Sequence, residues 1–330
     1  MTSIKGNKMK LFLIFISLFA FCCAEEKDMK SYRTAEITSI NLGEKFSNKD
    51  LQISGLDWHG NDLILLPQFP ADFNFKIFSV SKQDILHYLE GDQKALPVSE
   101  ISFKENGLRD NILEPEYEAI AFNGDRAYLL TEKENPMESY IVRAAISDGS
   151  LNIENNKYSK IPIPFDIFEM GCEALFIAED TIYVFYEANG VNIFSQPVVF
   201  RFDLELNPLS PVSLPNIEFR VTDATQIDTD NSFWIINNFW EGEESKLQPA
   251  QDAFIPDVFN NRDHGVKRLI QLKLNAGSIS FAGMHPIMLR PENWNWEGLV
   301  KLDNKGFLII NDEFSPEPMK TSLGFIPYPK

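Results

Sequence analysis

Ten oxygen-bearing side chains recur at regular positions along this sequence of 330 residues. Five short segments with the pattern of a β-strand begin with one such residue each: Ser54, Glu118, Glu173, Asp223 and Glu297. Five more follow, 14 or 15 positions after their partners: Gln68, Glu132, Glu187, Asn238 and Asp312. Because an antiparallel return strand places the second set beside the first, we expect all ten side chains near one axis.

Most of these side chains are carboxylates, and carboxylates gathered at one place repel one another. Two of them about 4 Å apart repel by roughly 4 kcal/mol at an effective dielectric constant near 20. Either some carboxyl groups keep a proton, or a cation lies among them. An all-oxygen site without a histidine cluster or a pair of thiolates suits Ca²⁺. We therefore expect a Ca²⁺ site formed by the first set; the alternative is that these residues only cap strands in a wet channel.

The elements that position these residues form a fivefold internal repeat. Each copy is a strand, a turn containing Gly, Asn or Asp, and a second strand, as in 54–66 and 118–130. Two further strand-like runs separate consecutive copies, whose first residues are 64, 55, 50 and 74 positions apart. Four antiparallel strands per repeat are typical of a β-propeller blade. The sequence therefore predicts an all-β fold, a five-bladed β-propeller with four antiparallel strands per blade, as a single domain over residues 30–330.

The two ends of this domain are expected to complete one blade together. After its hairpin, the last repeat has only the strand-like run 323–327, whereas the unassigned run 34–40 lies near the other end of the chain. Pairing of the two would close the last blade with the N-terminal strand and leave no unpaired edge. Only residues 82–88 look briefly helical.

Residues 1–24 have the features of an export signal. Basic residues precede the apolar run 11–21, and Cys22, Cys23 and Ala24 follow it. Eleven residues are too few to span a bilayer, so we predict a signal peptide. Lipidation at Cys22 or Cys23 competes with cleavage after Ala24. The protein is then an exported periplasmic or cell-surface lipoprotein, or a secreted one, with membrane contact only through the lipid anchor.

Charge and loop lengths restrict the partners. A net charge of −18 disfavours nucleic acid, which needs a basic surface. The long connections 104–117, 133–138 and 240–265 open on the face of the acidic residues, and the last of these is a candidate lid. We expect a monomer that binds a small molecule or a protein on this face. The candidate substrate-binding residues are Arg109, Lys133, Arg220, Trp240 and Trp296.

Three strand starts carry a resemblance to known propellers. Glu118-Ala-Ile, Glu173-Ala-Leu and Trp296-Glu297-Gly298-Leu299 resemble the Glu-Gly-Leu strand starts of the calcium-activated nucleotidases (apyrases) and of the bacterial phytase-like or esterase-like propellers. The nucleotidase resemblance implies five blades with Ca²⁺ in the central channel. It also implies that the first set of oxygen-bearing residues would hold this ion.

Two functions follow, and the sequence leaves open whether the protein is an enzyme. One is a calcium-dependent phosphate-ester hydrolase, nucleotidase-like or phytase-like, in which Glu132, Glu187 or Asp312 would orient or deprotonate water. The alternative is a non-catalytic propeller that binds a ligand or a protein and keeps a structural cation in its channel.

Overall fold

The structure is a computed structural model, and it describes residues 32–47, 51–133, 136–258, 265–290, 294–311 and 321–328. The expectations for Cys22, Cys23, Asp312 and the segment 1–24 fall outside these residues.

The fold is mainly β, with several sheets of antiparallel strands joined in sequence order. The first group comprises β3 (Ile53–His59), β4 (Asp62–Pro67), β5 (Lys76–Ser81) and β6 (Ser99–Lys104). The second comprises β7 (Glu116–Asn123), β8 (Arg126–Lys133), β9 (Glu138–Ser147) and β10 (Ser150–Ile161). Parallel pairing of β10 with β6 joins these two groups into one eight-stranded sheet.

The remaining strands form three further sheets. One contains β11 (Ala174–Ala178), β12 (Thr181–Phe185), β13 (Val198–Asp203) and β14 (Pro208–Ser213). Another contains β15 (Arg220–Ala224), β16 (Ser232–Phe239), β17 (Val266–Leu274), β18 (Ile279–Phe281), β19 (Ile287–Arg290) and β1 (Arg33–Glu36). The last contains β20 (Trp296–Leu302), β21 (Gly306–Asn311), β22 (Ser322–Pro327) and β2 (Thr38–Ile40).

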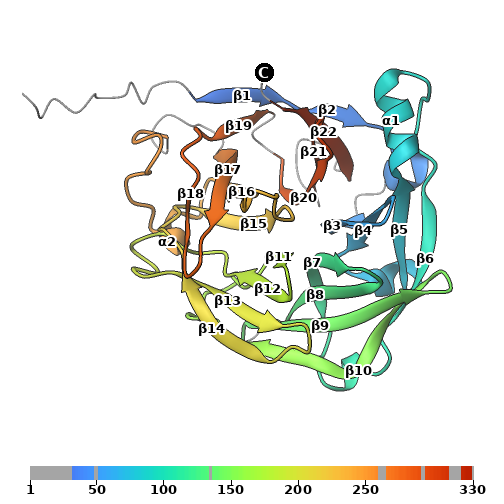
Figure 1. The fold of residues 1–330 in the computed structure, drawn as a ribbon, viewed down its shortest axis with the longest axis horizontal. Coiled ribbons are helices and arrows are strands. Elements are labelled where there is room, and N and C mark those ends of the chain that lie inside the picture. Colours follow the sequence, from blue (N-terminus) through green and yellow to red (C-terminus); the bar gives the residue numbers. More distant parts are fainter. Residues whose placement is uncertain are drawn as a thin grey trace, which may run out of the picture. The chain divides into compact units, whose positions relative to one another are not determined.

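The first strands of these groups meet around the centre. β3 contacts β7, β7 contacts β11, β11 contacts β15, β15 contacts β20, and β20 contacts β3. Figure 1 shows these strands at the centre, with the later strands of each group outside them. Glycines allow the close approach: a Cβ at Gly55 would lie 3.1 Å from the Ala119 Cα, and one at Gly298 would lie 2.7 Å from the Leu56 Cγ. The inner strands therefore need small residues where they touch.

Local sequence explains the hairpins and the helices. Gly60 and Gly124 adopt φ values of 60° and 63° in the turns between the first two strands of their groups, which is hairpin geometry. The expected helical segment is α1 (Lys82–Glu90), and the Ser81 side chain caps it by accepting from the Asp84 N–H. The remaining helical elements are α2 (Glu244–Leu247), η1 (Glu44–Ser47), η3 (Pro70–Phe73) and η4 (Leu108–Asp110). Within the described residues, every helix is too short or too polar to cross a membrane.

The N-terminal run 34–40 pairs with two sheets instead of one. β2 pairs antiparallel with β22, as expected, but β1 pairs parallel with β19 in the neighbouring sheet. The chain crosses between the sheets at Ile37, whose N–H donates to the Arg290 carbonyl. The Ile37 side chain fills the space beside Gly324, where a Cβ would lie 2.2 Å from its Cγ2. The N-terminal strand therefore joins two adjacent sheets at their outer edges.

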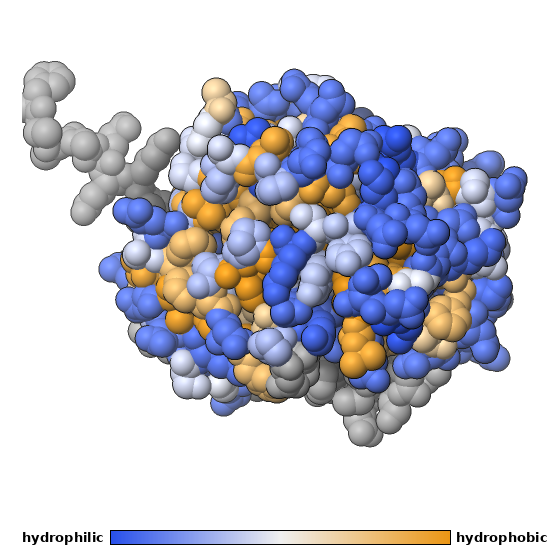
Figure 2. Space-filling view, turned by 90° about the horizontal axis from the view of Figure 1, so that it is seen from below, coloured by the Kyte–Doolittle hydropathy of each residue, from blue (hydrophilic) through white to orange (hydrophobic). Residues whose placement is uncertain are grey.

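The face of the molecule drawn in Figure 2 is largely polar and carries apolar patches. Figure 2 shows the side formed by the outer strands, where hydrophilic residues predominate and hydrophobic ones gather in small groups. The exposed large hydrophobic residues include Phe165, Phe168 and Leu209. This polarity agrees with the large net negative charge of the chain.

Candidate functional site

Each first strand has one oxygen-bearing residue in it near its start or directly before it. In four of them the pairing register shifts by one residue, and the inserted residues are Ser54, Glu118, Thr222 and Glu297. Glu173 stands directly before β11 in the remaining group. The expectation that Asp223 belongs to this set is wrong, because Thr222 occupies its place. Both neighbours carry oxygen, so spacing alone could not tell which one the bulge inserts.

The two hydroxyl residues of the set join neighbouring strands. The Ser54 hydroxyl donates to the Tyr117 carbonyl at 2.5 Å, and the Thr222 hydroxyl donates to the Trp296 carbonyl at 2.9 Å. Each carbonyl belongs to the residue directly before an inserted glutamate. Ser54 therefore holds two inner strands together, and its hydroxyl proton is committed to a backbone carbonyl.

The carboxylates of the set gather with those of the return strands in what we call the acidic cluster: Glu118, Glu132, Glu173, Glu187, Glu297 and the guanidinium of Arg220. All five glutamates are at most 7% exposed. Burial raises the pKa of Glu118 well above its usual range, and the neighbouring Glu132 carboxylate raises it further. Burial also raises the pKa of Glu173 and of Glu187, against the opposing effect of Arg220. Repulsion and desolvation therefore act together on these groups.

Arg220 supplies positive charge inside the acidic cluster. Its Nη2 donates to Glu173 Oε1 at 2.8 Å, and its Nε donates to Glu187 Oε1. Its Nη1 lies 3.4 Å from Oε1 of Glu243, the residue directly before α2. One guanidinium thus serves three carboxylates from three separate parts of the chain. The sequence singled out Arg220 as a possible ligand-binding residue, whereas the structure commits it to internal ion pairs.

Glu132 and Glu187 hold the backbone that enters β11. Glu132 Oε1 accepts from the Ser139 hydroxyl at 3.0 Å and from the Cys172 N–H. Glu187 Oε2 accepts from the Gly171 N–H at 3.0 Å. A Cβ on Gly171 would lie 1.7 Å from Glu132 Oε1, so only glycine fits there. These contacts give both glutamates a positioning role, and the catalytic role expected of them gains no support from their surroundings.

Two buried oxygen atoms beside the acidic cluster have no hydrogen-bond partner. They are Glu173 Oε2 and Asn238 Oδ1, in residues that are 7% and 0% exposed. The Asn238 amide nitrogen donates to the Trp296 carbonyl at 2.7 Å, which fixes the direction of its oxygen. Buried polar atoms are rarely left unsatisfied. Both oxygen atoms are therefore available to coordinate a cation or to accept a hydrogen bond from a ligand.

The donor chemistry suits a hard cation, although the expected ligand set is only partly assembled. Carboxylate and amide oxygens are the ligands that Ca²⁺ prefers. Asp223 does not belong with the glutamates, and the Ser54 hydroxyl is engaged. Across the parts of the chain that the structure describes, no group of three or more His, Cys, Asp or Glu side chains is already placed to hold a metal ion.

Asp57 and Asp223 form a second pair of carboxylates between the inner strands. Asp57 Oδ2 accepts from the Phe122 N–H at 2.7 Å and from Gln226 Nε2 at 3.1 Å. Asp223 Oδ2 accepts from the Leu299 N–H at 2.6 Å. Burial raises the pKa of Asp57 to about 7 and that of Asp223 well above its usual range. Asp57 was not among the residues expected at the site, although a lone Asp within the apolar strand 53–58 was a usable signal.

The remaining candidate cationic residues, Arg109 and Lys133, are paired with carboxylates outside the acidic cluster. Arg109 Nε lies 2.5 Å from Glu105 Oε2, and its guanidinium lies over the Phe75 ring. Lys133 Nζ lies 3.9 Å from Glu138 Oε2. Neither residue touches the acidic cluster through a contact of this kind, so the structure does not bring the expected phosphate-binding residues together.

Of the two candidate tryptophans, Trp296 is buried in the packed interior and Trp240 is half-buried. Trp296 is fully buried, and its ring centroid lies 5.1 Å from that of Trp294. Trp240 Nε1 donates to Asn295 Oδ1 at 3.1 Å, and the Lys267 Nζ lies 3.4 Å from the Trp240 ring centroid. Trp296 is therefore used for packing between sheets, and one face of the Trp240 ring is already covered by the Lys267 ammonium group in a cation–π contact.

The described part of the candidate lid, 240–258, is anchored in the fold. Leu247 and Val258 are buried in a hydrophobic core cluster. Arg268 Nη2 lies 2.5 Å from Asp252 Oδ2, and both side chains are almost completely buried. The described part of this segment is therefore an integral part of the fold, because it contributes apolar residues and a buried ion pair to the core.

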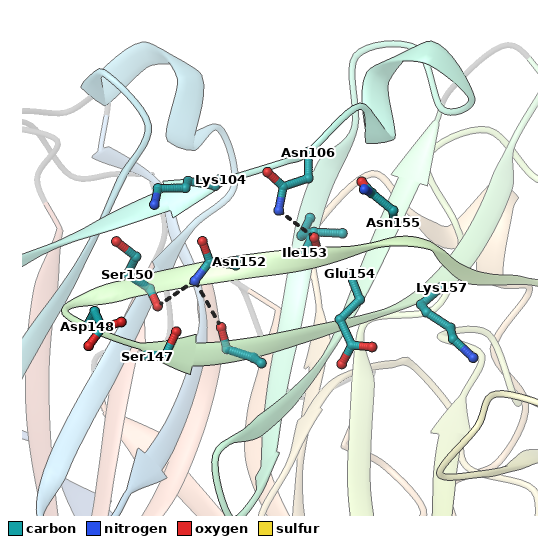
Figure 3. A pocket seen from close by; sticks show the side chains of 11 residues that line it. Lys104, Asn106, Ser147, Asp148, Ser150, Asn152, Ile153, Glu154, Asn155 and Lys157 are labelled. Atoms are coloured by element: carbon teal, nitrogen blue, oxygen red, sulfur yellow. Dashed lines mark hydrogen bonds between the residues drawn. The ribbon is translucent and has the colours of Figure 1, made fainter.

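A surface pocket of about 520 Å³ lies between β6 and β10. Figure 3 shows its mostly polar lining, in which Asn106 donates to the Ile153 carbonyl at 2.7 Å and Asn152 donates to the Ser150 carbonyl at 3.1 Å. Its lining residues include none from the acidic cluster. The pocket is therefore a feature of the outer strands, separate from the candidate site.

Comparisons with known proteins reach the fold and no further. No protein-family model matches the chain, and no curated protein matches it. Matching solved structures include Kuenenia stuttgartiensis hydrazine synthase, with 9% identity over 86% of this chain and 64% of that chain and a TM-score of 0.40. The catalytic domain of Coprinopsis cinerea GH62 α-L-arabinofuranosidase shares 11% identity over 90% of this chain and 98% of its own, with a TM-score of 0.48.

A third match is Bombyx mori GH32 β-fructofuranosidase, with 11% identity over 88% of this chain, 59% of that chain and a TM-score of 0.47. The chain thus spans less than two thirds of the hydrazine synthase and fructofuranosidase chains. These are distant likenesses to β-propeller proteins. They identify neither the nucleotidase family nor the phytase-like family.

Proposed function

We propose that this protein is a five-bladed β-propeller that binds a cation, with Ca²⁺ the favoured ion, at the acidic cluster. The circle of contacts among β3, β7, β11, β15 and β20 supports the five-bladed arrangement. One observation supports a bound cation: five buried glutamates gather in the acidic cluster, its one guanidinium pairs with only two of them, and Glu173 Oε2 is buried without a hydrogen-bond partner. A cation would remove the repulsion between carboxylates that burial otherwise makes costly.

The residues that would hold the ion are Glu118, Glu173, Glu297 and Asn238. Glu118 and Glu297 are the inserted residues of β7 and β20, and Glu173 stands directly before β11. Asn238 Oδ1 is the second of the two buried oxygen atoms that lack a partner. Ca²⁺ accepts about six to eight oxygen ligands in flexible geometry, which suits side chains from separate strands. Glu132 and Glu187 are left out because they bind backbone N–H groups.

Binding of a ligand or a protein on the long-loop face is favoured over hydrolysis. Arg109 is paired with the buried Glu105, Lys133 with the partly buried Glu138, and Arg220 with buried carboxylates of the acidic cluster. No free cation among these three residues is left for a phosphate group. Calcium-dependent phosphate-ester hydrolysis therefore rests on the sequence resemblance alone. We also retain export and a lipid anchor at Cys22 or Cys23 as proposals from the sequence.

Calcium-dependent stability tests the cation site. If only the folded chain binds the ion, Ca²⁺ at a hundred times its dissociation constant should stabilise the fold by about 2.7 kcal/mol, and chelation should reverse this. Glu118→Gln keeps the shape but removes one charge, so it should weaken the calcium response and raise or preserve stability in chelator. Glu90→Gln, at the exposed end of α1, is the matched control and should behave like the parent.

The measurement is the unfolding midpoint of each variant with Ca²⁺ and with chelator. A parent whose midpoint ignores Ca²⁺ would end the proposal. A screen of nucleotides, inositol phosphates and aryl esters with added Ca²⁺ separates the two functions. Calcium-dependent turnover that Glu118→Gln abolishes would replace the binding function with the hydrolase.

A further inference from the structure

Arg220 occupies a distinctive place in the repeat. It stands two residues before the inserted Thr222, and the equivalent positions before Glu118 and Glu297 hold Glu116 and Asn295. On the return strand β16, Arg220 pairs with Asn238, and in the second group Glu116 pairs in the same way with Glu132 of β8. Of these inner strands, β15 alone begins with a basic side chain directed at carboxylates of a neighbouring group.

The contacts of Arg220 divide the acidic cluster into two parts. Glu187 and Glu173 Oε1 receive positive charge from the guanidinium. Glu173 Oε2 lies on the other side: it is buried in a residue that is 7% exposed, and it has no hydrogen-bond partner. In one part of the cluster, the Arg220 guanidinium balances the carboxylate charge. In the other part, the buried oxygen Glu173 Oε2 has no positively charged group bound to it.

We infer that Arg220 is the residue that sets how many cations the acidic cluster accepts and how tightly it binds them. The inference rests on the proposed function, and it identifies the residue that controls cation binding at that site. The guanidinium repels a divalent ion that approaches Glu173 Oε2, and in a poorly solvated site this repulsion is screened less than it would be in bulk water. Arg220 also occupies the carboxylate oxygens that a second ion would need. The cluster should therefore accept a single exchangeable ion.

A purely structural role makes a different prediction. Arg220 ties β15 to the residues around β11 and, through Glu243, to the root of α2. If this were its whole purpose, its replacement would lower stability without changing the number of bound ions or their affinity. Breaking a buried ion pair is costly whatever its function, so stability alone cannot decide the matter.

The experiment is a calorimetric titration of the full chain with CaCl₂ after chelator treatment. Arg220→Gln removes the internal charge and should bind Ca²⁺ at least tenfold more tightly than the parent, with a second equivalent taken up. Arg220→Lys keeps the charge and should take up one ion. Arg220→Gln combined with Glu187→Gln restores the parent's net charge and should return the affinity to within about threefold of the parent.

Arg126→Gln is the matched control, because it removes one exposed positive charge from the chain; it should leave both the number of ions and the affinity unchanged. Unchanged or weaker binding by Arg220→Gln overturns the inference. If this variant unfolds in chelator, recovery of the fold with Ca²⁺ supports the inference, and failure to recover at a hundred times the parent's dissociation constant overturns it.

The outcome for the parent is separate. A parent that binds no Ca²⁺ refutes the proposed function. If Arg220→Gln then binds the ion, Arg220 is itself the resident cation of the site; its control of cation binding is supported, and the expectation that the parent accepts one exchangeable ion is wrong. If neither binds, both fail.

Discussion

The clearest consequence of the buried carboxylates is an unusual dependence of stability on pH, and Asp57 allows its size to be worked out. Burial raises its pKa from the usual 3.8 to about 7. Between these values the folded chain keeps a proton that the unfolded chain releases. The free energy of unfolding therefore falls as pH rises through this window. A shift of about three pH units corresponds to at most about 4 kcal/mol.

Asp57→Asn removes this contribution, because the amide cannot ionise. One oxygen, Oδ2, accepts both the Phe122 N–H and the Gln226 amide, so the Asn amide oxygen can replace it. Urea unfolding in chelator at pH 5, 6, 7 and 8 measures the effect. The free energy of unfolding of the variant, minus that of the parent, should rise by about 3 kcal/mol between pH 5 and pH 8. The reason is that about two pH units of the window between the two pKa values lie in this range.

The comparison between variants is necessary because other buried carboxyl groups change stability in the same direction. Burial also raises the pKa values of Glu118, Glu173 and Asp223. Asp92→Asn, which changes an exposed carboxylate after α1, should show the same pH dependence as the parent. An Asp57→Asn curve parallel to that of the parent would refute the reasoning, because Asp57 would then ionise as readily in the folded chain as in the unfolded one.

Three further changes test the packing around the site. Gly171→Ala would place a methyl group 1.7 Å from Glu132 Oε1, and the displaced carboxylate should cost about 1–3 kcal/mol in thermal unfolding; an unchanged midpoint would contradict this. Asp252→Ala leaves Arg268 buried without its ion-pair partner and should lower the free energy of unfolding by about 3–5 kcal/mol, measured in urea; a loss below about 1 kcal/mol would argue against this pair. Deletion of 241–257 removes a buried Leu and that same Asp, so circular dichroism should report a destabilised chain, and a deletion protein as stable as the parent would return the segment to the role of a lid.

The sequence predicted the elements well wherever the signal was local. Alternating apolar residues and Gly- or Asn-containing turns indicated hairpins such as β3–β4 and β7–β8, and these are present. The helical segment at 82–88 and the pairing of residues 38–40 with the last strand are also confirmed. Side-chain alternation and turn chemistry depend on residues within a few positions of one another, so they can be read from the chain alone.

The tertiary structure decided how the polar residues are used. The choice between Thr222 and Asp223 depended on a one-residue shift in strand pairing, which reverses the face of every side chain that follows. Whether a carboxylate holds a backbone N–H, as Glu132 and Glu187 do, depends on residues about 16 to 40 positions away. The sequence shows that carboxylates recur with the repeat. Their partners, and therefore their protonation, are fixed only when the strands meet at the centre and water is excluded, because burial and distance determine the energy of a charge.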